Sequence, residues 1–230
     1  MKRSKANNAL IVLDKPRSVI SEKFKSIRTN IMFSVANENL QVVTFTSEKA
    51  NAGKSTVSAN VAITCAQAGY KTLLIDGDMR KPTQHYLFNT SNLDGLSNII
   101  VNNSDTHQSI KSTEIGYLDL ITSGPIPPNP SELIGSENLI SIIEELKEEY
   151  DYIFIDTPPV NAVTDAQLFA EIARYVVYVI DVRKNDRNEI KKGKELIEKA
   201  GAKILGVVLN KATKDNDSTT YSYYGEEEWL

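Results

Sequence analysis

The sequence predicts an α/β fold, a single domain in which a mostly parallel β-sheet carries helices on both faces. Short segments that are apolar throughout alternate along the chain with segments of helical pattern. Strands of that kind are typical of parallel sheets that are covered on both sides. The chain has 230 residues and 41% hydrophobic content, which is enough for one sizeable core.

The expected elements follow from this alternation. Apolar segments of strand length cover residues 41–46, 72–76, 118–122, 152–156, 175–181 and 204–209. Helices are expected where apolar residues recur every three or four positions or where a glycine ends the segment. The expected helices are 19–36, 55–68, 138–149, 166–173 and 188–200.

The chain divides into three parts. Residues 1–17 are expected to form an irregular arm, and residues 18–214 the domain, within which 18–36 is the first helix. Residues 215–230 have little aliphatic content and no period, which predicts a flexible tail.

Composition and the N-terminus limit the classes of protein that the chain can belong to. A net charge of -4 does not favour nucleic-acid binding, and the first residues lack the apolar core of a signal peptide. No window approaches the roughly 18 apolar residues that span a bilayer. The single cysteine, Cys65, lies in an apolar helical stretch and is expected to be a small buried residue in a reducing cytoplasm.

A phosphate-binding loop is expected between the strand 41–46 and the helix 55–68, so the fold is of the P-loop NTPase type. Gly53 lets backbone N–H groups approach a phosphate, and the helix N-terminus adds a favourable dipole. Lys54 is placed for the β- and γ-phosphates of ATP and the Ser55 hydroxyl for Mg²⁺. The residues expected to hold ATP here are Ala52, Gly53, Lys54, Ser55 and Thr56.

The loop departs from the strict Walker A pattern. That pattern requires glycine at position 48, where this chain has Glu48. The run from Lys49 through Ala50 and Asn51 to Lys54 resembles the deviant Walker motif of MinD/ParA-like ATPases, in which an extra lysine contacts phosphate. This adds Lys49 and Asn51 to the candidate nucleotide contacts, although an exposed, solvated Lys49 is an equal alternative.

Acidic residues follow two of the expected strands. Asp76 and Asp156 each end an apolar strand, which is the Walker B arrangement for holding Mg²⁺ directly or through water. Asp78, two residues later than Asp76, is placed to act as a base or as a further contact to the metal. The expected metal ligands are therefore Ser55, Asp76, Asp78 and Asp156. Asp181 also ends a strand but has no companion motif and is assigned a structural role.

Three motifs together resemble the bacterial tyrosine kinases. They are Leu73-Leu-Ile-Asp-Gly-Asp-Met-Arg-Lys-Pro82, Gly124-Pro-Ile-Pro-Pro-Asn-Pro-Ser-Glu-Leu133 and Phe154-Ile-Asp-Thr-Pro-Pro-Val160. The resemblance implies an enzyme that takes the γ-phosphate of ATP, with Lys54, Asp76 and Asp78 as catalytic residues. It also implies trans autophosphorylation of the tail cluster Tyr221, Tyr223 and Tyr224, and a role in regulating capsular or exopolysaccharide synthesis.

The resemblance further implies assembly and a membrane partner. In this family a Glu-x-x-Arg-x-x-Arg motif in the first helix joins subunits into a ring, and here Glu22, Lys25 and Arg28 occupy it, with lysine in place of the first arginine. Soluble members act in the cytoplasm and are recruited to the membrane by an activator, a chain-length regulator protein of the CapA type. By analogy with related P-loop proteins, Asn210 is expected near the adenine base or as a turn cap.

Two alternative functions share the same motifs. One is a MinD/ParA-like ATPase switch that hydrolyses ATP to position other molecules, and the other is an adaptor that binds ATP without catalysis. The tyrosine cluster and the Asp76-to-Lys81 motif favour the kinase. Arg80 and Lys81, within that motif, are expected either to contact phosphate and tail acids or to lie on the surface.

Overall fold

The described strands form one parallel sheet with an antiparallel edge. A computed structural model describes residues 9–34, 40–102 and 106–212, and in that part of the chain seven strands lie in the order β3-β4-β2-β5-β1-β6-β7. Only β3 runs antiparallel to its neighbour, β4. The strands are β1 (Val42–Ser47), β2 (Thr72–Asp76), β3 (Lys111–Ser112), β4 (Leu118–Ile121), β5 (Tyr152–Asp156), β6 (Tyr175–Asp181) and β7 (Lys203–Asn210).

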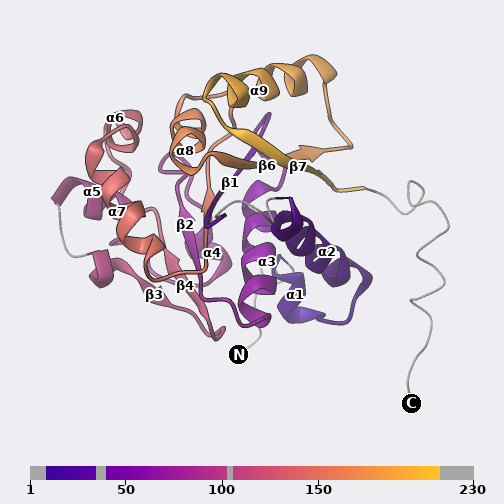
Figure 1. Ribbon diagram of the computed structural model, residues 1–230, viewed down its shortest axis with the longest axis horizontal. Helices are drawn as coiled ribbons and strands as arrows, with labels where there is room; N and C mark the ends of the chain where they lie inside the picture. Colours follow the sequence, from indigo (N-terminus) through magenta and orange to yellow (C-terminus); the bar gives the residue numbers. More distant parts are fainter. Residues whose placement is uncertain (1–8, 35–39, 103–105, 213–230) are drawn as a thin grey trace.

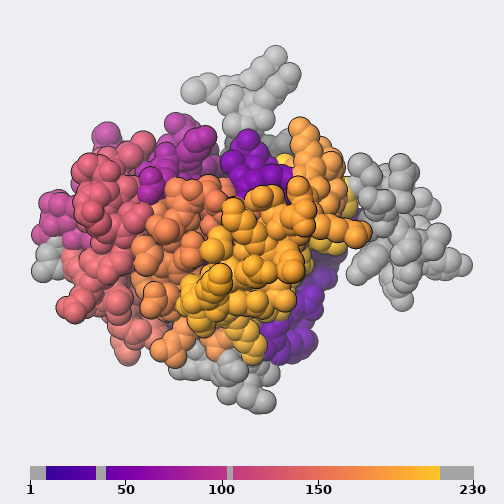
Figure 2. Space-filling view, turned by 90° about the horizontal axis from the view of Figure 1, so that it is seen from above, coloured from indigo at the N-terminus to yellow at the C-terminus, as the bar shows by residue number. Residues whose placement is uncertain are grey.

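Helices cover both faces of this sheet (Figure 1). Apolar side chains of α1, α2 and α3 pack on one face, and those of α5, α7, α8 and α9 pack on the other. The helices are α1 (Ile11–Asp14), α2 (Val19–Phe33), α3 (Lys54–Gln67), α4 (Gln84–Leu87), α5 (Leu96–Asn102), the 3-10 turn η2 (Thr106–Ser109), α6 (Pro130–Ile134), α7 (Glu137–Lys147), α8 (Asp165–Ala173) and α9 (Arg187–Lys199). Seen from above, the orange atoms of α8 and the golden atoms of α9 lie next to each other (Figure 2).

The central strands β1, β2, β5 and β6 are largely apolar because successive side chains enter different cores. In β5, Phe154 packs with α3, whereas Ile153 and Ile155 pack with α7 and α8. The same alternation divides Leu74 from Leu73 in β2. The predicted α/β fold with a mostly parallel sheet and helices on both faces is therefore confirmed.

The N-terminal segment differs from the expected irregular arm. Residues 11–14 form the helical turn α1, and Val12 is fully buried in the core beside α3. Asn60 of α3 holds this segment by accepting from the Val12 N–H at 3.1 Å and donating to the carbonyl of Ala9 at 2.7 Å. The sequence did not predict this turn, because a four-residue helix with one buried apolar residue is too short to show a helical period.

Several short elements were also absent from the prediction. These are β3, α4, α5 and α6, which have two to seven residues each. The first long helix ends at Phe33, and residues 35–39 lie outside the described part, as does the predicted tail 215–230. No helix of the described residues is both long and apolar enough to traverse a lipid bilayer.

The topology brings two strand-end aspartates together. Asp76 of β2 and Asp156 of β5 are register partners in neighbouring parallel strands, so they lie side by side at the carboxyl edge of the sheet. The loop between β1 and α3 reaches the same edge, because β1 pairs with β5. The expected phosphate loop and the expected Walker B residues thus meet at one place.

The loop between β1 and α3 requires two left-handed residues. Asn51 has φ of 63° and Gly53 has φ of 98°. Glycine and asparagine are the residues that adopt this conformation at low cost. A Cβ atom at position 53 would also lie 2.1 Å from the Asn210 side-chain nitrogen, so the Asn210 side chain would have to move.

We predict that Asn51→Val destabilises the protein by about 1–3 kcal/mol, because a β-branched residue is strained at positive φ. Asn51 is exposed, so the change removes no packing. Urea unfolding followed by circular dichroism measures the effect. Asn51→Gly is the matched control and should unfold within about 1 kcal/mol of the parent chain; equal stability of the valine and glycine variants would contradict the strain.

We also predict that Cys65 does not react with a thiol reagent in the folded protein. Cys65 is buried in α3, and burial raises the pKa of its thiol to about 12, with Arg28 acting weakly in the opposite direction. The thiolate that reacts is therefore scarce and shielded at neutral pH. A chromogenic disulfide should label one thiol only after denaturation, and rapid labelling of the native protein would show that α3 opens.

Candidate active site

The loop residues that precede α3 explain how the missing Walker glycine is tolerated. Glu48 has no positive φ, so a side chain is unstrained at this position. Its carboxylate is fully buried and pairs with the Lys49 ammonium at 3.4 Å. The Lys49 side chain is 37% exposed, and its ammonium contacts Glu48 of the same chain.

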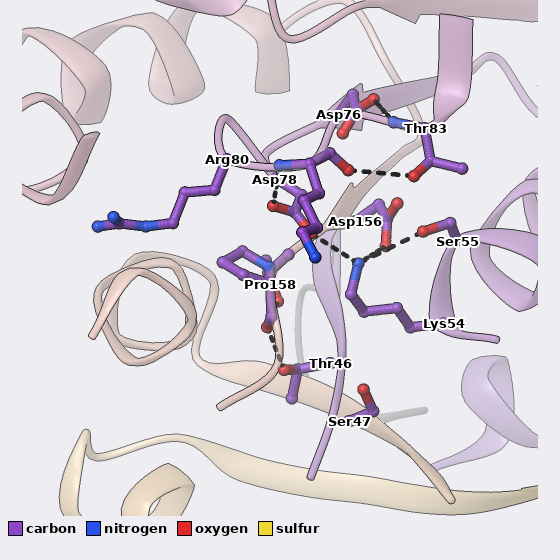
Figure 3. Close-up of polar contacts among 12 residues, drawn as sticks. Thr46, Ser47, Lys54, Ser55, Asp76, Asp78, Arg80, Thr83, Asp156 and Pro158 are labelled. Carbon is purple, nitrogen blue, oxygen red and sulfur yellow. Dashed lines mark hydrogen bonds and ion pairs between the residues drawn. The ribbon is translucent and has the colours of Figure 1, made fainter. Parts of the chain in front are cut away.

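A lysine and two carboxylates converge at the start of α3 (Figure 3). The Lys54 ammonium lies 3.0 Å from Asp78 Oδ2 and 3.4 Å from Asp156 Oδ1. Its distance to the Ser55 hydroxyl is 3.4 Å. All four residues are buried or nearly so. Lys54, Ser55, Asp78 and Asp156 therefore lie together in one cluster.

Asp76 lies beside this cluster and is held by backbone groups. Its Oδ2 accepts hydrogen bonds from the N–H groups of Thr83 and Gln84, both at 2.8 Å. Its Oδ1 is buried and has no hydrogen-bond partner. One oxygen of Asp76 is thus fixed and the other is left available.

Gln84 was not predicted from the sequence, although it contacts the site at several points. Its side-chain Nε2 donates to Asp156 Oδ2 at 2.9 Å and lies 3.1 Å from the Ser55 carbonyl oxygen. The residue lies two positions after the Asp76-to-Pro82 motif, but glutamine at the start of a four-residue helix carries no sequence signal of its own.

Burial and repulsion between neighbouring carboxylates raise the pKa values of Asp76 and Asp156. Burial raises the pKa of Asp76 to about 8, and the neighbouring Asp156 adds to the rise, against the bonds from Gln84 and Thr83. Burial also raises the pKa of Asp156, against the attraction of Lys54. For Lys54, burial alone would lower the pKa, but Asp156 and Asp78 outweigh it and hold the ammonium charged.

The donor set fits a hard divalent cation. Ser55 offers a hydroxyl oxygen, Asp76, Asp78 and Asp156 offer carboxylate oxygens, and Asp76 Oδ1 is a buried acceptor without a partner. In the described residues no three His, Cys, Asp or Glu side chains gather closely enough to enclose a metal by themselves. Mg²⁺ is commonly bound by one or two carboxylates together with water and substrate phosphates, and the hydroxyl and carboxylate oxygens here are donors of that kind.

Residues at the end of β7 form hydrogen bonds to backbone carbonyls of the phosphate loop. The Asn210 side-chain amide donates to the Ala52 carbonyl at 2.8 Å. Lys211 donates to the Asn51 carbonyl and pairs with Asp181 Oδ2 at 2.6 Å, which lowers the pKa of Asp181. Asn210 was expected near the adenine base or as a turn cap; its Nδ2 contacts the loop, and its Oδ1 accepts a hydrogen bond from the Lys211 N–H at 2.9 Å. Asp181, expected to be structural, anchors the lysine that touches the loop.

Arg80 points away from the Lys54 cluster (Figure 3). Its guanidinium makes a forked pair with buried Asp165 at 2.9 and 3.0 Å and contacts the Ser131 hydroxyl at 3.2 Å. It therefore ties the loop after β2 to α6 and α8 rather than facing the phosphates. The backbone N–H of Lys81 donates to Asp78 Oδ1 at 3.0 Å, which holds that carboxylate in place.

The candidate interface residues lie on α2. Glu22 and Lys25 form an exposed ion pair at 2.7 Å. Arg28 donates to the Thr64 carbonyl of α3 at 2.7 Å, so one of its N–H groups is used within its own chain. The tyrosines at 221, 223 and 224 lie outside the described residues.

Sequence comparisons agree with these motifs. Residues 40–200 match the AAA domain family. CapB of Staphylococcus aureus is 55% identical over 226 residues, which is 98% of this chain and 99% of CapB. The tyrosine-protein kinase YwqD of Bacillus subtilis is 38% identical over 225 residues, 98% of this chain and 94% of YwqD.

Solved structures give the same result. The crystal structure of the chimerical protein CapA2B2 matches with a TM-score of 0.87 and 56% identity, covering 90% of this chain and 91% of that one. The MinD protein of Pyrococcus horikoshii, solved with Mg-ADP, has a TM-score of 0.64 and 22% identity over 74% of this chain and 69% of its own, which shows the shared fold alone. The chain belongs to the bacterial tyrosine-kinase family.

Proposed function

We propose that the chain transfers the γ-phosphate of ATP to the tail tyrosines Tyr221, Tyr223 and Tyr224 of a neighbouring copy. The observation that carries the proposal is the convergence of the Lys54 ammonium with Asp78 and Asp156, at 3.0 and 3.4 Å, where the phosphate loop enters α3. That arrangement supplies a cation for the phosphates and a carboxylate for the incoming phenol. The kinase relatives support the reaction class.

ATP binding uses groups that the fold already orients. The positive φ values of Asn51 and Gly53 shape the loop whose N–H groups would face the phosphates, and the dipole of α3 favours their negative charge. Lys54 would shift from its carboxylate partners to the β- and γ-phosphates. Positioning and charge neutralisation, rather than covalent catalysis, supply most of the acceleration in phosphoryl transfer.

Asp78 is the residue best placed to receive the phenolic proton. In the transfer, the tyrosine oxygen bonds to the γ-phosphorus while the bond from that phosphorus to the bridging oxygen of ADP breaks. The proton passes from the phenol to Oδ2 of Asp78, which Lys54 leaves when it moves to the phosphates, while the Lys81 N–H holds Oδ1.

Ser55, Asp76, Asp78 and Asp156 would hold Mg²⁺, directly or through water. Bound there, the ion neutralises charge on the phosphates and on the transferring group. The paired Asp76 and Asp156 carboxylates give this site two neighbouring oxygen donors. Among the described residues Lys54 is the one ammonium within 4 Å of either carboxylate, and it reaches only Asp156, so their charge is not fully neutralised by the protein.

The described part of the chain ends beside the phosphate loop, which Asn210 touches. Tyr221 comes eleven residues after Asn210, an extended reach of at most about 40 Å. Such a tail could enter its own site or a neighbour's. A ring built through Glu22, Lys25 and Arg28 would place each tail near the next subunit, which favours transfer between chains.

The same proposal includes a partner and a place in the cell. The solved structure CapA2B2, which is similar to this chain, is named as a chimerical protein, and its name combines CapA with CapB. We infer that a membrane activator of the CapA type recruits this chain from the cytoplasm to the membrane and stimulates it. Control of capsular or exopolysaccharide synthesis would follow from that recruitment.

A nucleotide switch without tyrosine transfer is the second candidate. Lys49 and the fold shared with MinD favour it. The products separate the candidates, because a switch releases inorganic phosphate, an adaptor leaves ATP intact, and a kinase leaves phosphotyrosine on the tail.

We predict that Lys54→Met lowers tyrosine phosphorylation at least about 100-fold, because the phosphates lose their buried cation. The variant is mixed with an active chain in which Tyr221, Tyr223 and Tyr224 are phenylalanine. Transfer between chains then places phosphate on the tail of the Lys54→Met chain, detected by mass spectrometry. The Lys54→Met chain incubated alone with Mg-ATP is the control, and phosphotyrosine there would contradict the role of Lys54.

We predict that phosphorylation of the tail loosens the assembly. Each phosphate adds about -1.5 to -2 charges, close in sequence to Glu226, Glu227 and Glu228, so the tails of a ring would repel one another. Light scattering should show a smaller mass after phosphorylation, and added salt should reduce the difference. The chain with all three tyrosines changed to phenylalanine is the control, and an unchanged mass after full phosphorylation would refute the prediction.

A further inference from the structure

Gln84 is a fully buried amide in the centre of the site. It has an exposure of 0%, and it is the first residue of α4, just after the Asp76-to-Pro82 motif. Its side chain crosses to β5, where Nε2 donates to Asp156 Oδ2 at 2.9 Å, and to α3, where Nε2 meets the Ser55 carbonyl at 3.1 Å and the Ser58 hydroxyl at 3.3 Å.

The polarity of this side chain needs an explanation beyond packing. Burying an amide costs free energy unless its hydrogen bonds are replaced. The two hydrogens on Nε2 find acceptors, but Oε1 is buried without any partner. An apolar residue of similar length would fill the same space without leaving an orphaned oxygen. The interaction gained by the amide is its bond to Asp156.

That bond decides which oxygen of Asp156 is presented to the site. Oδ2 is held by Gln84, and Oδ1 faces the Lys54 ammonium at 3.4 Å. The Gln84 backbone N–H meanwhile holds Oδ2 of Asp76. One residue thus fixes a single oxygen on each of two neighbouring carboxylates and joins both to the turn of α3 that carries Ser55.

We propose that Gln84 is a positioning residue for the metal-nucleotide site. It sets the rotation of the Asp156 carboxylate and its distance from Ser55, so that a divalent cation meets an ordered set of oxygens. The inference rests on the proposed function, in that Mg-ATP is taken as the ligand. Partners that orient metal ligands in this way typically change metal affinity or activity about 10- to 100-fold when they are removed.

The test variant is Gln84→Met, which keeps the length of the side chain and loses its donor. The Gln84 backbone N–H, and with it the bond to Asp76, is unaffected by the change. Calorimetry measures the affinity for a non-hydrolysable ATP analogue with and without Mg²⁺. We expect the gain in affinity that magnesium brings to fall about tenfold or more, while binding without magnesium stays the same.

A kinetic measurement accompanies the binding assay. The turnover number for tyrosine phosphorylation should fall about tenfold or more. The KM for the tyrosine substrate should change little, because Gln84 is fully buried and is not exposed to a substrate that arrives from the solvent. Gln84→His retains an N–H donor near the end of the side chain and should recover part of the magnesium effect.

The matched control is Thr44→Val, which removes one buried hydrogen bond, from Oγ1 to the Tyr175 carbonyl at 3.1 Å, elsewhere in the sheet. It should lose stability but keep the magnesium effect. A normal magnesium effect in folded Gln84→Met would overturn the proposal. If that variant does not fold, Gln84→Leu, which also lacks the donor, takes its place, and a normal magnesium effect there would overturn the proposal too. A parent chain whose affinity does not respond to magnesium would overturn the proposed function as well.

Discussion

The site depends on one constraint, which is that two carboxylates must be held side by side in a buried place. Asp76 and Asp156 are register partners on neighbouring parallel strands, so the sheet itself fixes their separation. Burial and mutual repulsion disfavour their charged forms. The arrangement persists because Lys54 offsets charge from one side and hydrogen bonds from Thr83 and Gln84 hold the oxygens from the other.

The surrounding structure serves to keep these groups in place. Lys211 and Asn210 hold carbonyl oxygens of the phosphate loop from the end of β7, and Asp181 keeps Lys211 oriented. On the other side, Arg80 and Asp165 fasten the loop after β2 to α8. The phosphate loop and the Asp76–Asp78 loop are therefore each tied to an element outside the nucleotide motifs, which limits how far Lys54 and Asp78 can separate.

Sequence reasoning found the parts of this arrangement that topology determines. Strands such as β5 are apolar on both faces because both faces are covered, and their carboxyl ends share an edge, so Asp76 and Asp156 could be placed together. Gln84 comes from a four-residue helix without period, and Asp165 is the first residue of α8, just before the predicted helix 166–173. The contacts of both residues are made across the fold. Their polarity predicts an exposed position, whereas both are fully buried, so they could not have been found from composition or spacing.

The altered phosphate loop shows which parts of the Walker motif are backbone requirements and which are chemistry. A residue at position 48 needs no left-handed conformation here, so Glu48 replaces glycine without strain. Asn51 does need that conformation, and asparagine can adopt it, whereas any other residue at Gly53 would be strained and would displace the Asn210 side chain. The chemistry resides in Lys54 and Ser55, which the motif retains. A motif can therefore fail as a pattern of letters and still be satisfied as a pattern of backbone angles, because the phosphate-facing N–H groups depend on the angles alone.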